Sequence, residues 1–210
     1  LLFTGDQIYE RVAEYGIPMA PLEPATLDYQ RKRYLFGWAY RDLLARTPSI
    51  AMPDDHDVYH GNIWGAEGKK ADPPELYAPT EQRGTVEPPN RTKLWQDSGG
   101  YKMPSEWVNM VQRTQTSHLP DPFDPTPVKQ GISVYYTSLL LGGLSLAIIE
   151  DRKWKSAPSP TVPMAKIENG WAQNPDYDPV KDGDVPGAQL LGDRQLRFLD
   201  QWAQDWSSGA

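Results

Sequence analysis

The chain has 210 residues, of which 39% are hydrophobic, and it carries a formal net charge of −7. This length suits one domain with a real core, and the 8 Trp and 11 Tyr argue against disorder. The acidic balance without any basic run argues against a nucleic-acid interface, the absence of cysteine excludes disulfides and thiolate chemistry, and no apolar run is long enough to span a membrane.

The first part of the chain predicts a β-α-β unit. Short apolar runs at residues 1–3 and 49–52 are typical of buried strands, and each is followed almost at once by carboxylates. Between them, residues 26–46 predict a helix with Thr26 as its N-cap. Its expected inward face is apolar and consists of Tyr34, Leu35, Trp38 and Ala39.

The two acidic loops after these strands form the first candidate site. Because the carboxyl ends of neighbouring parallel strands meet at one sheet edge, the loops should lie side by side. They bring together four carboxylates: Asp6, Asp54, Asp55 and Asp57. Such packing is costly unless positive charge neutralises it, and a divalent or trivalent metal ion is the simplest source. We therefore expect oxygens of Asp6 and Asp55 roughly 4–6 Å apart, as a two-metal site requires.

The middle of the chain combines a long irregular segment with a helix. Residues 65–104 show little periodicity and much Pro, Gly and charge, which predicts a long loop or insertion. A shorter helix capped by Ser105 should follow and run to about Thr116. Its expected inward side chains are Trp107, Met110 and Val111.

The last part of the chain predicts a hairpin, a second loop and a final helix. Residues 131–136 and 144–149 have the composition of strands, and the glycine pair at 142–143 is typical of the turn between them. Residues 155–186 are again rich in Pro and Gly and predict a loop. Residues 192–206 predict a helix. The apolar residues at helical spacing along it are Leu196, Leu199, Trp202, Ala203 and Trp206.

Four stretches carry motifs in a distinctive order. Residues 5–9 read Gly-Asp-x-x-Tyr and residues 54–57 read Asp-Asp-His-Asp. Residues 146–152 are a strand-like run ending in Glu-Asp-Arg, and residues 189–196 contain Leu-Gly-x-x-Gln-x-x-x-Leu as a helix start. This set resembles the PhoD-like alkaline phosphatase/phosphodiesterase branch of the calcineurin-like metallophosphoesterases. Asp55 stands where the wider superfamily has Asn, which is the PhoD-like variant.

The resemblance implies an α/β fold, a metallophosphoesterase-type sandwich of β-sheets flanked by helices. Residues 1–210 would be the central portion of one such domain, with loop insertions near 65–104 and 155–186. The family also has an earlier strand and later histidine-bearing loops that complete its site. We therefore expect this chain to be part of a longer polypeptide. A secreted or periplasmic location is suggested by the resemblance alone.

The resemblance also implies roles for individual residues. Asp6 would bridge two metal ions, while Tyr9 and Asp55 would each hold one. His56 would contact substrate and protonate the leaving oxygen, and Arg152 would bind the phosphate. The other candidates for substrate contacts, or for support of the ligands, are Asp54, Asp57, His60 and Asn62.

The implied reaction is metal-dependent hydrolysis of phosphoric mono- or diesters by a metal-bound hydroxide. Tyr9 favours Fe³⁺, since a phenolate needs a strong Lewis acid, and the second position suits Ca²⁺, Mg²⁺, Mn²⁺ or Zn²⁺. A non-catalytic ligand-binding or assembly protein on the same fold is the alternative.

Several residues keep a plain structural interpretation beside the functional one. Tyr9 fits a core tyrosine, His56 fits a hydrogen-bonded structural histidine, His60 fits a structural residue, and Arg152 fits a partner of Asp151. Four tryptophans in loop-rich regions suit either packing or aromatic walls for a sugar or lipid-like substituent of the substrate: Trp64, Trp95, Trp154 and Trp171.

Overall fold

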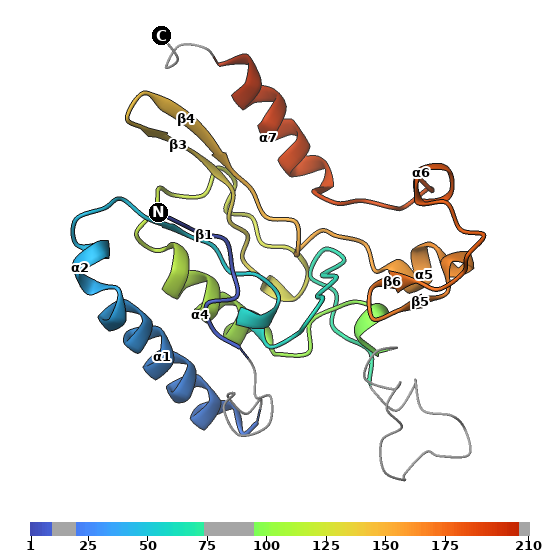
Figure 1. Cartoon of the computed structure of the whole chain (residues 1–210), viewed down its shortest axis with the longest axis horizontal. Coiled ribbons are helices and arrows are strands. Elements are labelled where there is room, and N and C mark those ends of the chain that lie inside the picture. Colours follow the sequence, from blue (N-terminus) through green and yellow to red (C-terminus); the bar gives the residue numbers. More distant parts are fainter. Residues whose placement is uncertain (10–19, 74–94, 206–210) are drawn as a thin grey trace.

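The computed structural model describes residues 1–9, 20–73 and 95–205, and it contains the predicted β-α-β unit. Strand β1 (Leu2–Phe3) pairs in parallel with β2 (Ile50–Ala51), with Leu2 opposite Ile50. Helices α1 (Leu22–Ala39) and α2 (Arg41–Leu44) lie between the two strands in the chain (Figure 1). The parallel pairing confirms that the two acidic loops leave the same edge of this small sheet.

Helix α1 differs from the prediction in both its start and its face. It begins at Leu22, and the Thr26 hydroxyl donates to the Leu22 carbonyl inside the helix (2.8 Å) instead of capping it. The expected inward residues are largely exposed, with Tyr34 at 70% and Trp38 at 58%. The residues that face the protein instead are Ala25, Tyr29 and Phe36, and the Phe36 ring meets that of Phe3 at 5.1 Å. Apolar residues occur on several sides of this helix, so periodicity alone selects the wrong face.

The main core lies between α1 and helix α4 (Ser105–Thr116), whose bounds agree with the prediction. Trp107 and Val111 of α4 are buried as expected. The Trp107 ring packs against Tyr29 of α1 (5.5 Å between centroids) and against Tyr59 (4.6 Å). Tyr59 directly follows the one-turn 3₁₀ helix η1 (His56–Val58), which continues the second acidic loop. The aromatic core therefore holds the end of the second acidic loop in place through Tyr59.

An antiparallel hairpin forms above α4. Strand β3 (Thr137–Leu141) pairs with β4 (Leu144–Ile148) through the predicted two-residue turn at 142–143, where both glycines have positive φ. The first strand was expected at 131–136, and this is wrong, because a two-residue turn places the partner of β4 directly before the glycines. The 3₁₀ turn η4 (Lys129–Gly131) and a buried extended segment occupy the expected range.

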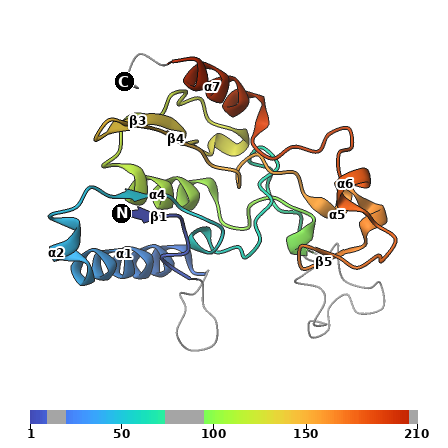
Figure 2. The ribbon, with the colours of Figure 1, turned by 45° about the horizontal axis from the view of Figure 1, so that its top comes forward.

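Helix α7 (Gly192–Gln204) covers the hairpin, so that α1, α4, the hairpin and α7 follow one another in layers in both ribbon views (Figures 1 and 2). Phe198 is buried, and Leu199 and Trp202 pack against the same cluster. The predicted inward positions Leu196 and Ala203 are exposed instead, because the face in contact includes Gln195 and Phe198. Trp206 lies outside the described residues.

The predicted loop at 155–186 forms an arm on one side of the layers (Figure 2). It is irregular apart from very short elements: α5 (Pro158–Thr161), η5 (Pro163–Ala165), β5 (Ile167–Glu168), β6 (Trp171–Ala172) and α6 (Pro179–Asp182). The described part of 65–104 holds a parallel bridge between Lys70 and Tyr101, and residues 74–94 lie outside the described part.

The described residues form three separate two-stranded sheets. The larger metallophosphoesterase-type sandwich therefore stays a prediction. Among the described helices, none combines the length and the apolar composition needed to cross a lipid bilayer.

Candidate metal centre

The loops after β1 and β2 bring three potential metal ligands together. Asp6, Asp55 and His56 each offer one ligand atom, and these atoms all lie within 4.8 Å of one another. The expected closeness of the Asp6 and Asp55 oxygens is thus confirmed. His56 was expected to serve the substrate, and its imidazole lies within the same small group of donor atoms.

Asp57 holds the two loops together. Its carboxylate is fully buried, and one oxygen accepts hydrogen bonds from the backbone N–H groups of Asp6 (2.7 Å) and Asp54 (3.0 Å). The other oxygen accepts from the Ile8 N–H (3.1 Å) and from the Gln115 amide (2.9 Å). Burial raises the pKa of Asp57 to about 6, although these hydrogen bonds act in the opposite direction. With both oxygens occupied, Asp57 positions the site and does not face a substrate.

Gly5 allows the first loop to approach the second. A Cβ atom at Gly5 would lie 2.1 Å from the Asp54 Cβ, far inside van der Waals contact, and the φ of Gly5 is +115°. Asp6 follows with a φ of +60°, in the left-handed region that Asp tolerates better than most residues. The Gly-Asp pair therefore has a steric basis at this position.

The Asp6 carboxylate has one oxygen with a protein partner and one without. Its Oδ2 accepts a hydrogen bond from the Tyr9 hydroxyl (2.6 Å), whereas Oδ1 is buried and has no hydrogen-bond partner among the described residues. The Tyr9 ring stacks on the His56 imidazole at 4.3 Å and is 46% exposed. Tyr9 is thus part of the site's surface, and its interpretation as a core tyrosine is wrong.

Arg152 reaches the site from the segment after β4. Its guanidinium makes a two-pronged ion pair with Asp54, in which Nη2 donates to Oδ2 at 3.2 Å, and Nη2 also lies 3.7 Å from Asp55 Oδ1. The expected alternative partner Asp151 instead binds Lys155 (3.0 Å), so that pairing is wrong. The phosphate contact of Arg152 stays a prediction.

These contacts change the charge balance that the sequence suggested. Arg152 compensates Asp54, and backbone N–H groups with Gln115 satisfy Asp57. Of the four aspartates, Asp6 and Asp55 are the two that each offer an oxygen within 4.8 Å of the other and of a His56 nitrogen, and Arg152 also lies near Asp55. A cation beside the unpartnered, buried Asp6 oxygen fits this arrangement, because a buried acceptor without a partner is costly.

His60 and Asn62 follow each other closely in the second acidic loop but differ in burial: His60 is buried and Asn62 is half-buried. The burial of His60 agrees with its structural interpretation, and neither of its ring nitrogens has a hydrogen-bond partner among the described residues. Burial lowers the pKa of His60 well below its usual value, and the charges of Lys102 and His56 add to this effect. The Asn62 N–H donates to Asp55, and its side-chain amide donates to the Asn169 carbonyl (3.3 Å).

Gln115 is a site-forming residue that the sequence analysis did not single out. It lies on α4, is completely buried, and donates to both Asp57 and the Tyr29 hydroxyl (3.2 Å). The signal was available, because Gln115 follows Trp107 and Val111 at spacings of eight and four residues on the buried face of a predicted helix. A polar side chain on such a face needs an internal partner.

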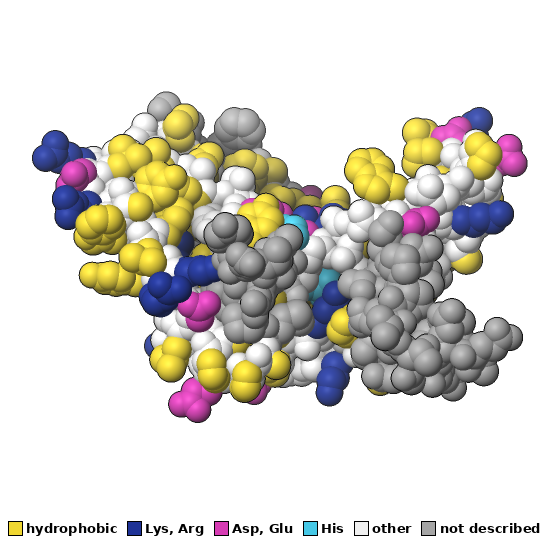
Figure 3. All heavy atoms as spheres, turned by 60° about the horizontal axis from the view of Figure 1, so that its bottom comes forward, with side chains coloured by type: hydrophobic (Ala, Val, Ile, Leu, Met, Phe, Trp, Pro, Cys, Tyr) yellow, Lys and Arg dark blue, Asp and Glu magenta, His cyan; other side chains and the backbone are white. Residues whose placement is uncertain are grey.

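On the face of the molecule shown in Figure 3, histidine side chains lie near acidic and basic ones between the layered body and the arm. Comparisons of this chain with models of known protein families, with curated proteins and with solved structures find no match. The PhoD-like resemblance therefore rests on the sequence motifs alone and stays a prediction.

Proposed function

We propose that this protein is a metal-dependent hydrolase of phosphoric mono- or diesters, as its resemblance to the PhoD-like metallophosphoesterases implies. The observation that carries the proposal is the convergence of Asp6 and Asp55 from two parallel strand ends, with one Asp6 oxygen buried and unpartnered. Oxygen ligands with one imidazole suit divalent cations, and Tyr9 beside Asp6 adds a phenol suited to Fe³⁺.

The residues that would hold metal are Asp6, Asp55 and Tyr9, with His56 next to them. When bound, the metal ions would supply Lewis acidity that activates water and polarises the ester. The chain's own groups then arrange the reactants. The carboxylate of Asp57 fixes the spacing of the two loops, and the Arg152–Asp54 pair fixes a guanidinium beside Asp55 that steadies negative charge.

His56 would supply a proton to the leaving oxygen. Stacking on Tyr9 fixes its ring plane, and an imidazole exchanges protons near neutral pH. Its closeness to the Asp6 and Asp55 oxygens also allows it to serve as a ligand, and metal content of a His56 variant separates the two roles.

Metal content and ester hydrolysis test the proposal together. The complete protein, of which we expect these 210 residues to be a part, should contain tightly bound metal by elemental analysis and should hydrolyse p-nitrophenyl phosphate or bis(p-nitrophenyl) phosphate. Asp6→Asn should lose both properties, because it removes the charge at the unpartnered oxygen. Asp28→Asn is the matched control, since Asp28 forms an ion pair with Arg31 of the same helix, α1, and is not part of the candidate metal centre.

Two results would overturn the proposal. One is metal content that is equal in the wild type and Asp6→Asn. The other is a metal-loaded complete protein that hydrolyses neither ester, which would favour the ligand-binding or assembly alternative on the same fold.

A further inference from the structure

The tip of the arm lies against the second acidic loop. Strands β5 and β6 are joined by Asn169 and Gly170, whose φ angles of +54° and +80° suit the tight hairpin turn that Asn-Gly favours. The Asn62 side-chain amide donates to the Asn169 carbonyl (3.3 Å). A Cβ atom at Gly170 would lie 3.5 Å from the Asn62 amide nitrogen. The turn is therefore in direct contact with the loop that carries Asp55.

A buried carboxylate fixes the turn in this place. Asp97 is fully buried, and its two oxygens accept hydrogen bonds from the backbone N–H groups of Asn169 (2.7 Å) and Gly170 (2.8 Å). The segment that carries Asp97 is itself tied to the continuation of the acidic loop, because the Gly100 N–H donates to the Trp64 carbonyl (2.8 Å). Asp97 therefore holds the tip of the arm next to this loop.

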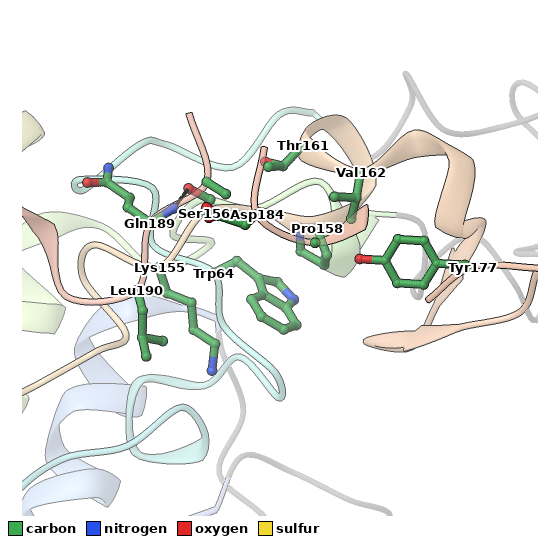
Figure 4. A pocket seen from close by; sticks show the side chains of 12 residues that line it. Trp64, Lys155, Ser156, Pro158, Thr161, Val162, Tyr177, Asp184, Gln189 and Leu190 are labelled. Atoms are coloured by element: carbon green, nitrogen blue, oxygen red, sulfur yellow. Dashed lines mark hydrogen bonds between the residues drawn. The ribbon is translucent and has the colours of Figure 1, made fainter. Parts of the chain in front are cut away.

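Apolar packing contributes less to the placement of the arm. A cavity of about 450 Å³ opens beside Trp64, and most of its wall residues belong to the arm, among them Pro158, Val162 and Tyr177 (Figure 4). Walls that face a void lose van der Waals contacts on that side. The position of the turn therefore depends mainly on its polar contacts with Asp97 and Asn62.

Asn62 connects the turn to a candidate metal ligand. Its backbone N–H donates to Oδ2 of Asp55. The φ of Asn62 is +54°, a left-handed conformation that a residue other than glycine keeps where its surroundings fix it. The bond from its side chain to Asn169 fixes it from the side of the arm. Outer hydrogen bonds of this kind orient a ligand carboxylate, and their loss weakens metal binding.

We infer that Asp97 and the turn of Asn169 and Gly170 position the Asp55 carboxylate for metal binding, and that they act through Asn62. Asp97 is thus a positioning residue that lies outside the group of ligand atoms. Because coupling between two sites is reciprocal, bound metal should in return stabilise the docked turn. The inference rests on the metal centre of the proposed function and does not depend on the ester that is hydrolysed.

Calorimetric titration of the metal-free complete protein with Mn²⁺ tests the inference. Asp97→Asn places a donor against the N–H groups of the turn, and Asn62→Gly removes the side-chain amide but keeps the N–H that binds Asp55. Each should weaken Mn²⁺ binding about 10-fold, the lower end of the effect of outer hydrogen-bond partners. Asn174→Ala is the matched control, because the Asn174 amide also donates to a carbonyl of the arm, that of Met164 (2.9 Å), and Asn174 is not part of the candidate metal centre.

Hydrogen exchange of residues 167–172 provides a second measurement that a merely structural role would not change. Mn²⁺ should slow this exchange in the wild type and in Asn174→Ala, but not in Asn62→Gly. A variant that fails to fold would instead exchange rapidly along the whole chain, and the comparison of the wild type with and without Mn²⁺ needs no variant at all.

The outcomes separate this inference from the proposed function. Unchanged Mn²⁺ affinity in Asp97→Asn and Asn62→Gly, equal weakening by Asn174→Ala, or exchange of the turn that ignores Mn²⁺ would overturn the inference and leave the proposed function in place. Coupling of the turn to Mn²⁺ in a protein that hydrolyses neither ester would overturn only the proposed function. A complete protein that binds no metal would overturn both.

Discussion

At the scale of single residues, Asp57 is the side chain on which the geometry of the site depends. Asp57→Asn keeps the shape but turns one acceptor into a donor that faces backbone N–H groups. We expect the free energy of unfolding to fall by about 2–4 kcal/mol, because several buried donors lose a charged acceptor. Urea denaturation measures this. Asp28→Asn should change stability by less than about 0.5 kcal/mol, and an equally small effect of Asp57→Asn would contradict this role.

A substitution of His56 can show whether this residue acts in the chemical step or in metal binding. His56→Ala should leave metal content nearly intact and lower turnover of an aryl phosphate about 10²–10⁴-fold, the usual contribution of a general acid or base. The loss should shrink for esters with good leaving groups, which need less protonation. Elemental analysis and rates across a leaving-group series measure both effects. Loss of metal, or an equal rate loss for all esters, would show that His56 acts as a ligand instead.

At the scale of elements, the close approach of the two acidic loops can be tested with a pair of glycines. Gly5→Ala should lower the free energy of unfolding by about 2 kcal/mol or more, since the new methyl group meets Asp54 at a φ of +115°. Gly37→Ala in α1 meets no atom within 4 Å and should instead stabilise by about 0.5–1 kcal/mol. Thermal and urea unfolding report both. Equal responses of the two variants would argue against the tight loop contact.

The start of α7 shows why its motif has glycine and glutamine. A Cβ at Gly192 would lie 2.3 Å from the Trp154 ring, and its φ is +72°. Three residues later, the buried Gln195 amide accepts from the Glu150 N–H (2.9 Å) and donates to the Glu150 carbonyl (2.6 Å). The Gln195 amide thus satisfies both backbone groups of Glu150, as a neighbouring strand would do, and Glu150 lies two residues before Arg152. In this way α7 supports the segment that delivers Arg152 to the site.

At the scale of the whole molecule, an ion pair links α7 to the loop that precedes the hairpin. Asp124 accepts from Arg194 (2.8 Å) and from the Thr126 N–H (2.9 Å). Burial alone would raise the pKa of Asp124, but these hydrogen bonds and the guanidinium charge together lower it to about 2. A carboxylate with a lowered pKa stabilises the fold above its unfolded pKa of about 3.9, and this contribution is lost as the pH falls to about 2.

Removal of this carboxylate should therefore change how stability depends on pH. The wild type should lose stability between about pH 4 and pH 2, and Asp124→Asn should lose less over the same range while being less stable at pH 7. Thermal unfolding at a series of pH values measures this. Asp200→Asn, an exposed position on α7, serves as the control. Parallel pH profiles for the wild type and Asp124→Asn would contradict the role of the pair.

Much of the element order follows from local features of the sequence. The bounds of α4 were predicted because Trp107 and Val111 repeat at helical spacing, and the hairpin turn was predicted because glycine pairs adopt positive φ. The face of α1 was not predictable in this way. Its apolar residues occur on several sides, and the choice depends on where Phe3 and Trp107 lie.

The sequence by itself determined that two strand ends carry carboxylates, because a short apolar run followed by Asp is visible without any partner, and parallel pairing then brings Asp6 and Asp55 together. Only the tertiary structure decided how each charge is compensated. Arg152 and Asp54 are 98 residues apart, and the Gln115 donor to Asp57 comes from a helix 58 residues away. Periodicity and turn chemistry describe neighbours along the chain. Contacts between distant segments depend on how whole elements pack, and that packing also forms the cavity beside Trp64.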